Sequence, residues 1–461
     1  MQADYLSATG GDGSSDDGAG GGVGLRGRLV TGLPGGPVID DGTVVMAGGT
    51  IRWCGPTSDL PEGFDAEIRQ VPLILPGLVD VHCHGAVGHT FSADAEGARR
   101  AAAHHAAEGT TSVLASLVSA PSSVLLEQIA VLRGLVQDGT LAGLHLEGPF
   151  ITKSMCGAQD PAAIIDGDPA LLQQWLEAGR GTVRSLTLAP ETPHFAELVR
   201  LCRDFGVVPS LGHTNASAAQ TREVLAGVAG GVHGGGAGAG DDTGGTGPWS
   251  ATHLFNRMPP LGHRAAGPVA VMLQAAERSP GQMVLELIAD GVHLDPEIVR
   301  MVFGLVGPGS IALVTDAMAA AGMSDGHYTL GSLDVLVQDG VARLAPAAGA
   351  ADAAAGEDPA AREEPGAIAG ATSFLLENVR RCVEWGIPLA DAVAAASSTP
   401  ARLMGLDRVG KDQQGPARVG AIAAGYRADV LVATEELELL QAYRAGTLQT
   451  QEGNDRADSS V

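Results

Sequence analysis

Apolar segments with strand character alternate with segments of helical pattern through most of this chain of 461 residues. The strand-like segments are short and almost wholly apolar, which is typical of strands buried on both faces. Roughly eight such units predict parallel strands and, most simply, a (β/α)8 barrel, although a doubly wound open sheet would show the same alternation. The clearest strands fall within residues 110–118, 141–150, 183–190, 207–214, 249–255, 283–293 and 311–317.

The segment PGLVDVHCHG, residues 76–85, precedes the first helical segment and contains two closely spaced histidines. In a strand, His82 and His84 point to the same side, because side chains alternate between the two faces. Two neutral imidazoles, with Asp80 just before them, form half of a transition-metal site. Two buried histidines held only by hydrogen bonds would explain the same spacing, so this motif alone leaves both interpretations open.

Four further polar residues stand where other apolar strands end, namely Glu147, His213, His253 and Asp316. A (β/α)8 barrel collects the C-terminal ends of its strands on one face, so residues far apart in the chain converge there. Each residue taken alone has a simple structural explanation. Together with the histidine pair, they indicate a cleft that holds Zn²⁺ or a similar divalent metal, with one coordination position left for water.

Segments near both ends of the chain have β character and predict a second, smaller domain. Residues 23–75 contain short strand patterns joined by hairpin turns, and residues 419–433 return to a strand pattern. We therefore expect a small β-sandwich built from residues 23–75 and 400–450, beside a barrel built from residues 76–399. Low-complexity composition predicts loose segments at residues 1–22, 230–247, 345–366 and 451–461.

The composition of the chain limits its partners and its compartment. It carries 28 Lys and Arg against 53 Asp and Glu, a formal net charge of −25, which argues against nucleic-acid binding because that requires a basic surface. Its 5 scattered cysteines suggest neither a disulfide framework nor a zinc knuckle, and fit a reducing environment. The first residues lack the apolar core of a signal peptide, and no stretch reaches the roughly 18 apolar residues of a membrane span. We therefore expect a cytoplasmic protein with no membrane segment.

Taken in order, the motifs PGLVDVHCHG, GLHLEGPF, LGHTNA, ATHLFN, ADGVH and LVTDA resemble those of the amidohydrolase superfamily. Within it, the chain is similar to the N-acetylglucosamine-6-phosphate deacetylases. The similarity spans Pro76 to Leu403, and the terminal β segments agree more loosely. HLEGPF followed by GHTNA and THLFN is far more specific than the spacing of the two histidines alone.

This resemblance implies a metal-dependent hydrolase that converts N-acetylglucosamine 6-phosphate to glucosamine 6-phosphate and acetate. Glu147, His213 and His253 would bind the metal, and Asp316 would act first as general base and then as general acid. A divalent metal polarises the amide carbonyl and activates water. Some relatives lack the histidine pair, whereas His82 and His84 are present here. The chain could therefore hold one or two metal ions, Zn²⁺ by preference and Fe²⁺, Mn²⁺ or Co²⁺ as alternatives.

The resemblance also implies residues that bind the phosphate of the substrate. Arg264 and His293 match family residues donated across a dimer interface, which implies a homodimer, and a guanidinium suits a phosphate with several acceptor oxygens. Asn256 and the next backbone N–H match further phosphate contacts. Arg257 departs from the alanine usual in the family. The added positive charge could strengthen phosphate binding, or the side chain could point to solvent. We favour the solvent-facing orientation.

The segment CGAQDP resembles a sugar-contacting segment of the family. Ala158 occupies one contact position, and Gln159 replaces a histidine. This replacement puts one sugar contact in doubt, but we expect it to leave the metal site unchanged.

Other activities remain as alternatives. The same superfamily contains dihydroorotases, isoaspartyl dipeptidases and adenine deaminases, many of which carry a carbamylated lysine between two metals, whereas here the strand end supplies Glu147. From another class, the chain could be a catalytically inactive sugar-phosphate binding protein. Binding alone, however, would not need the acid/base residue Asp316.

Overall fold

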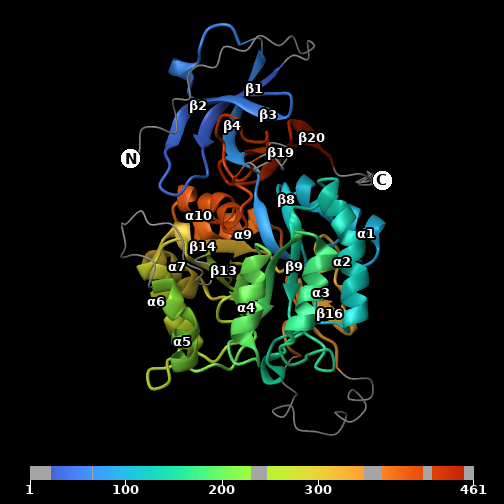
Figure 1. Cartoon of the computed structure of the whole chain (residues 1–461). Coiled ribbons are helices and arrows are strands. Elements are labelled where there is room, and N and C mark those ends of the chain that lie inside the picture. The colour runs from blue at the N-terminus through green and yellow to red at the C-terminus, as the bar shows by residue number, and fades with distance from the viewer. Residues whose placement is uncertain (1–21, 65, 230–246, 347–365, 409–417, 451–461) are drawn as a thin grey trace, which may run out of the picture.

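The computed structural model describes residues 22–64, 66–229, 247–346, 366–408 and 418–450 (Figure 1). The segments that we predicted to be loose, at residues 1–22, 230–247, 345–366 and 451–461, lie almost entirely outside these ranges. Within the described ranges, the helices are too short or too polar to cross a membrane.

Eight parallel strands form the central sheet of the molecule. They are β5 (Val79–Cys83), β8 (Ser112–Val118), β9 (Gly143–Glu147), β10 (Val183–Leu188), β11 (Val208–Leu211), β12 (Trp249–Ala251), β13 (Met283–Ile288) and β14 (Ile311–Val314). Their order in the sheet is β14-β13-β12-β11-β10-β9-β8-β5. Strands that are consecutive along the chain in this set are therefore neighbours in the sheet.

The last strand of this sheet returns to the first. After β14, the backbone N–H of Asp316 donates to the carbonyl oxygen of His82 at 2.9 Å, and Ala317 forms a parallel bridge with Cys83. An open doubly wound sheet would keep its edge strands apart. The predicted (β/α)8 barrel is therefore confirmed, and the alternative open sheet is wrong.

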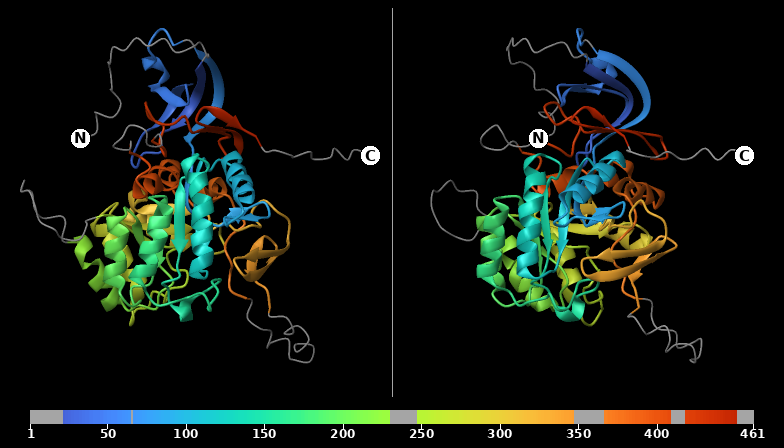
Figure 2. Two further views of the ribbon diagram at one scale, coloured as in Figure 1. Left: turned by 45° about the vertical axis from the view of Figure 1, so that its right-hand side comes forward. Right: turned by 90° about the vertical axis from the view of Figure 1, so that its right-hand side faces the viewer.

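Helices surround the barrel sheet (Figures 1 and 2). They are α1 (Ala95–Ala107), α2 (Ser122–Gln137), α3 (Pro169–Gly179), α4 (Phe195–Asp204), α5 (Ala218–Ala229), α6 (Gly267–Arg278) and α7 (Pro296–Val306), followed later in the chain by α9 (Leu375–Glu384), α10 (Leu389–Ala395) and α11 (Ser398–Leu403). Asp94, Asp168 and Asp295 precede α1, α3 and α7, and their side chains accept backbone N–H groups of the first helical turn. These caps satisfy backbone N–H groups of the first turn that have no partner within the helix, and so fix where each of the three helices begins.

A small antiparallel sheet follows β14 and lies at the side of the barrel (Figure 2). Its strands are β15 (Gly326–Leu330), β16 (Leu333–Gln338) and β17 (Val341–Leu344). The turn between β15 and β16 reaches the loops of the barrel, because Ser332 Oγ donates to Asp160 Oδ2 at 2.9 Å. Leu330, at the end of β15, therefore comes close to the C-terminal ends of the barrel strands.

The remaining large sheet unites both ends of the described chain. It contains β1 (Gly22–Val30), β2 (Val38–Ala47), β3 (Thr50–Pro56), β4 (Ala66–Pro76), β18 (Val430–Ala433), β19 (Leu439–Arg444) and β20 (Thr447–Gln449), in the order β20-β19-β18-β4-β1-β2-β3. Thr50 on β3 forms a bridge with Arg427, which lies just before β18, so the two ends of the sheet approach each other. The apolar core of this domain includes Leu25 from β1 and Val432 from β18. The small β domain built from both chain ends is confirmed, and its seven strands form one continuous sheet.

Candidate metal centre

Glu147, His213 and His253 lie together at the C-terminal ends of β9, β11 and β12. Glu147 Oε1 is 3.0 Å from His213 Nε2 and 3.1 Å from His253 Nε2, and the two Nε2 atoms are 3.0 Å apart. All three side chains are buried. The structure thus brings three of the predicted metal ligands into one group.

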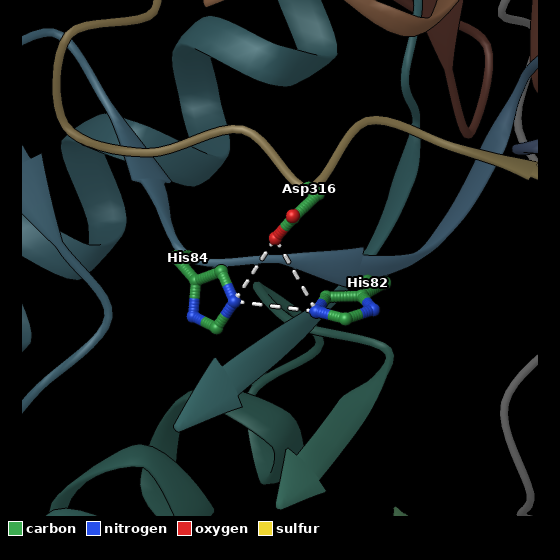
Figure 3. A group of neighbouring side chains, drawn as sticks. All are labelled: His82, His84 and Asp316. Atoms are coloured by element: carbon green, nitrogen blue, oxygen red, sulfur yellow. Dashed lines mark hydrogen bonds and ion pairs between the residues drawn. The ribbon is translucent and has the colours of Figure 1, made fainter. Parts of the chain in front are cut away.

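His82 and His84 form a second group with Asp316 (Figure 3). Their Nε2 atoms are 3.2 Å apart, and Asp316 Oδ1 lies 3.4 Å from His82 Nε2 and 3.2 Å from His84 Nε2. The histidines belong to the end of β5, and Asp316 follows β14. Because these are the two strands that meet where the barrel closes, this group depends on that closure.

Glu147 lies between the two groups. Its Oε1 is 3.6 Å from His82 Nε2, and its Oε2 is 3.3 Å from His84 Nε2. A carboxylate has two acceptor oxygens and can therefore face two cations at once. The six predicted residues form one continuous set of possible ligands.

The hydrogen bonds on the far side of the imidazoles indicate that this set fits a metal ion. Nδ1 of His84 faces the carbonyl oxygen of Ser116 at 3.1 Å, and Nδ1 of His213 faces that of Met155 at 2.8 Å. A carbonyl oxygen only accepts, so both Nδ1 atoms donate and a neutral ring presents a lone pair at Nε2. Nε2 of His213 then faces a carboxylate oxygen, and two acceptors so close repel each other unless a proton or a metal ion lies between them. Two nitrogen ligands of a tetrahedral Zn²⁺ stand about 3.3 Å apart, close to the separations found here.

The positive charge of neighbouring imidazoles favours the ionised form of both carboxylates in this set. Burial by itself would raise the pKa of Glu147, but the charge of His82 and the hydrogen bond to His213 outweigh it and hold this pKa well below its usual range. Burial acts in the same direction on Asp316, and the nearby His82 and His84 lower the pKa of Asp316 to about 2. A metal ligand and a general base must both be deprotonated, and these two residues meet that condition.

Three of the six residues have a left-handed backbone. The φ angles are 47° for His213, 28° for His253 and 52° for Asp316. This conformation is uncommon for residues other than glycine and costs on the order of 1–3 kcal/mol at each position. Strain of this kind concentrates at functional sites, where the surrounding fold compensates for it.

Two buried residues inside the barrel support the ligand His82, and neither was predicted from the sequence. Glu286 on β13 lies 3.1 Å from His82 Nδ1, and the ring of His145 on β9 packs edge-on against the ring of His82, with the ring centroids 4.6 Å apart. His145 also hydrogen-bonds Ser116 Oγ at 2.9 Å and Thr187 Oγ1 at 2.8 Å. Each left a signal in the sequence. Glu286 is the charged residue in the apolar segment MVLELI, and His145 lies two positions before Glu147, on the same face of its strand.

Gln159 contacts the metal centre, which corrects one of our predictions. Its Nε2 donates to Glu147 Oε2 at 2.5 Å, and its Oε1 accepts the backbone N–H of Ser119 at 2.7 Å. The expectation that Gln159 would leave the metal site unchanged is therefore wrong. A loop residue holds the second oxygen of Glu147, and this contact could not be read from the position of Gln159 in the sequence.

A cavity of about 300 Å³ opens onto the set, and five of the six side chains line it, the exception being His82. The cavity is also lined by Ala158, Asn256, Arg257 and His293. These are the predicted substrate-binding residues other than Arg264. Histidines, carboxylates, an amide and a guanidinium therefore face one cavity.

Arg257 and His293 lie in the wall of this cavity in specific ways. Arg257 packs so closely on Gly157 that a Cβ there would lie 2.6 Å from Arg257 Nε, so Arg257 does not point simply to solvent as we favoured. His293 Nδ1 is 2.7 Å from Asp290 Oδ2, which orients the ring. His293 thus reaches the cavity of its own chain, without the second subunit that the resemblance implied.

Arg264 lies outside the cavity as the described residues form it. It is exposed, in the segment between β12 and α6. The structure therefore brings together all the predicted site residues except this one.

Comparison with known proteins agrees with this geometry. Residues 73–448 match the amidohydrolase family. The chain is 31% identical over 416 residues to the N-acetylgalactosamine-6-phosphate deacetylase of Escherichia coli O157:H7. The aligned region covers 89% of this chain and 95% of that protein. It is 28% identical over 423 residues to the N-acetylglucosamine-6-phosphate deacetylase of Bacillus subtilis (strain 168), with 89% and 93% covered.

A solved structure is also similar. It is that of a mutant N-acetyl-D-glucosamine-6-phosphate deacetylase from Mycobacterium smegmatis in complex with N-acetyl-D-glucosamine-6-phosphate. The identity is 33% and the TM-score 0.77, with 94% of this chain and 100% of that chain covered.

The chain belongs to the amidohydrolase family. It is an enzyme of that family, and its resemblance to the N-acetylglucosamine-6-phosphate deacetylases, inferred above from its motifs, is confirmed.

Proposed function

We propose that this enzyme hydrolyses the acetamide of N-acetylglucosamine 6-phosphate and yields glucosamine 6-phosphate and acetate. One observation carries the proposal: a buried set of two carboxylates and four imidazoles shares a cavity with Asn256, Arg257 and His293. The carboxylates and imidazoles suit hydrolysis of an amide, and the other three residues offer donors to a phosphate. The proteins that resemble the chain are named for deacetylation of this class of sugar phosphate.

Five of the buried residues, Glu147, His213, His253, His82 and His84, would hold one or two divalent ions, Zn²⁺ by preference. Glu147, His213 and His253 would offer one set of ligands, and His82 and His84 would offer another, with Glu147 Oε2 lying 3.3 Å from His84 Nε2. When bound, such an ion polarises the amide carbonyl and lowers the pKa of water beside it. The hydrogen bonds of His84 and His213 already leave their Nε2 atoms free to act as ligands.

Asp316 would move the proton in this reaction. It lines the cavity, is ionised, and lies beside His82 and His84. Its carboxylate can accept a proton from the attacking water and deliver it to the amide nitrogen as the carbon–nitrogen bond breaks. The products are then acetate and glucosamine 6-phosphate, which carries the free amine.

The substrate phosphate would bind beside β12 and β13. Asn256 Nδ2 donates to the carbonyl oxygen of His253 at 3.2 Å, which ties this residue to the metal centre, and Arg257 and His293 add donors nearby. Ala158 would contact the sugar. We place Arg264 in the site of a second copy of the chain within a homodimer, and the enzyme in the cytoplasm, which suits its five free cysteines.

The proposal is tested by measuring acetate release from N-acetylglucosamine 6-phosphate before and after dialysis against a chelator. We expect release by the purified enzyme, its loss on chelation and its return with zinc. Binding of the sugar phosphate without release of acetate would indicate the inactive binding protein instead. Hydrolysis of an isoaspartyl dipeptide or of dihydroorotate in its place would indicate another member of the family.

N-acetylgalactosamine 6-phosphate is a second candidate substrate, because the relative from Escherichia coli O157:H7 is named for that epimer. The two sugars differ only in the orientation of one hydroxyl group. Comparing kcat/KM for both under the same conditions decides which of them is preferred.

A further inference from the structure

A second cavity, of about 530 Å³, adjoins the cavity of the metal centre. Both are lined by His84 and by Leu330. Its apolar lining includes Phe91, Val118, Ala120, Val124, Ala163 and Leu330, and polar side chains such as Ser92, Gln128 and Asp160 line it as well. Its volume is in the range of small-molecule sites. The proposed hydrolysis of an acetyl group does not need this space.

The walls of this second cavity are held in place by packing and hydrogen bonds. Phe91 and Ala163 are buried. The hydrogen bond of 2.9 Å between Ser332 and Asp160 ties the turn after β15 to the loop after β9. Gly331 in this turn approaches Val118 so closely that a Cβ would lie 2.8 Å from a methyl group. The cavity is therefore formed before a ligand enters.

The second cavity and the candidate phosphate site lie on opposite sides of the barrel mouth. The cavity is lined mainly by residues that follow β5, β8 and β9, whereas Asn256 and Arg257 follow β12 and His293 follows β13. In the closed sheet of eight strands, β8 and β12 are four places apart in either direction. A substrate with its phosphate beside β12 and its carbonyl at the metal centre would leave the side of the mouth near β8 for its acyl substituent.

We propose that the second cavity receives N-acyl chains longer than acetyl, so that the substrates of this enzyme include amino-sugar 6-phosphates with linear aliphatic N-acyl groups. This inference rests on the proposed function, since the chain is placed by the same carbonyl and phosphate. An acetyl methyl group fills only a small part of the space. Each further methylene that moves from water to the apolar wall strengthens binding about fourfold, and ordering of the chain offsets part of that gain.

The test compares kcat/KM for N-acetyl- and N-butyrylglucosamine 6-phosphate. We expect the butyryl compound to be hydrolysed within tenfold of the acetyl compound. Val124→Phe should lower kcat/KM for the butyryl compound at least tenfold and leave that for the acetyl compound within twofold. Val124 is 38% exposed on the first turn of α2, so the larger ring can be accommodated without disturbing the core. Ala120→Leu is a second variant with the same expected pattern, and Leu305→Phe on α7, also exposed, is the control that should change neither value.

The outcomes separate this inference from the proposed function. Wild-type hydrolysis of the acetyl compound, with the butyryl compound more than tenfold slower, would overturn the inference and leave the proposed function standing. Equal losses on both substrates in Val124→Phe and Ala120→Leu would also overturn it, because the cavity would then not distinguish chain length. Failure of the wild-type enzyme on both compounds would overturn the proposed function and the inference together.

Discussion

Nδ1 of His82 lies 3.1 Å from Oε2 of Glu286, and both side chains are buried inside the barrel. The same oxygen accepts the backbone N–H of His253 at 3.3 Å, and Oε1 accepts the hydroxyl of Ser250 at 3.1 Å. One carboxylate thus orients the ring of a histidine in one group and holds the backbone of a histidine in the other. Carboxylates behind metal-binding histidines set the tautomer and direction of the ring.

Glu286→Leu should weaken zinc binding by the His82 and His84 group about 10- to 100-fold, because the ring of His82 loses the acceptor that orients it. Glu286→Gln keeps an oxygen acceptor in the same place and should retain most of the affinity. Calorimetric titration of the metal-free protein with zinc measures the affinity of both variants. Wild-type affinity in Glu286→Leu would show that the carboxylate does not position His82.

Replacing His82 and His84 together by asparagine should reduce the zinc content of the saturated protein from up to two ions per chain to one. The group of Glu147, His213 and His253 remains intact in this variant, so we expect activity to fall but stay measurable. Metal analysis after saturation and dialysis gives the stoichiometry. One zinc per chain in both the wild type and the variant, with a lower melting temperature in the variant, would instead mean that the pair is structural.

Asp316→Asn should lower kcat by about 10²- to 10⁴-fold, the usual contribution of a general acid or base. The amide has nearly the same shape as the carboxylate but cannot accept the proton from water. Zinc bound by Glu147, His213 and His253 should remain, and so should substrate binding. Steady-state kinetics and metal content are the measurements, with Asp59→Asn in the small domain as the control. Near-normal turnover would remove Asp316 from the catalytic role.

Arg264→Ala should raise KM for the phosphorylated sugar about 10- to 100-fold and leave unphosphorylated N-acetylglucosamine unaffected. Losing a hydrogen bond to a charged group costs about 1.5–3 kcal/mol, which corresponds to this range. Arg278→Ala, an exposed arginine on the following helix α6, is the matched control. Because Arg264 is outside the cavity of its own chain, the effect should appear only where the enzyme is a dimer, as checked by light scattering. Equal effects on both substrates would mean that Arg264 does not contact the phosphate.

The sequence was sufficient for the parallel strands and for the placement of most candidate site residues at the strand ends. Parallel strands all run in one direction, so Glu147, His213 and Asp316, each at the end of an apolar strand, had to meet at one face once the sheet closed. The alternation of side chains along a strand placed His82 and His84 on one side in the same way. These deductions need only local geometry and the direction of the chain.

The tertiary structure decided the features that depend on distances between loops and between strands far apart in the sequence. Closure of the sheet, with Asp316 hydrogen-bonded to the backbone of His82, distinguished the barrel from an open sheet. The contact between Gln159 and Glu147 arises from the path of a loop, which local patterns do not specify. Glu286 lies behind His82 although 204 positions separate them, and only the ring of eight strands makes them neighbours. A sequence sets which face of a strand a side chain occupies, whereas its partners across the barrel depend on how the whole sheet closes and packs.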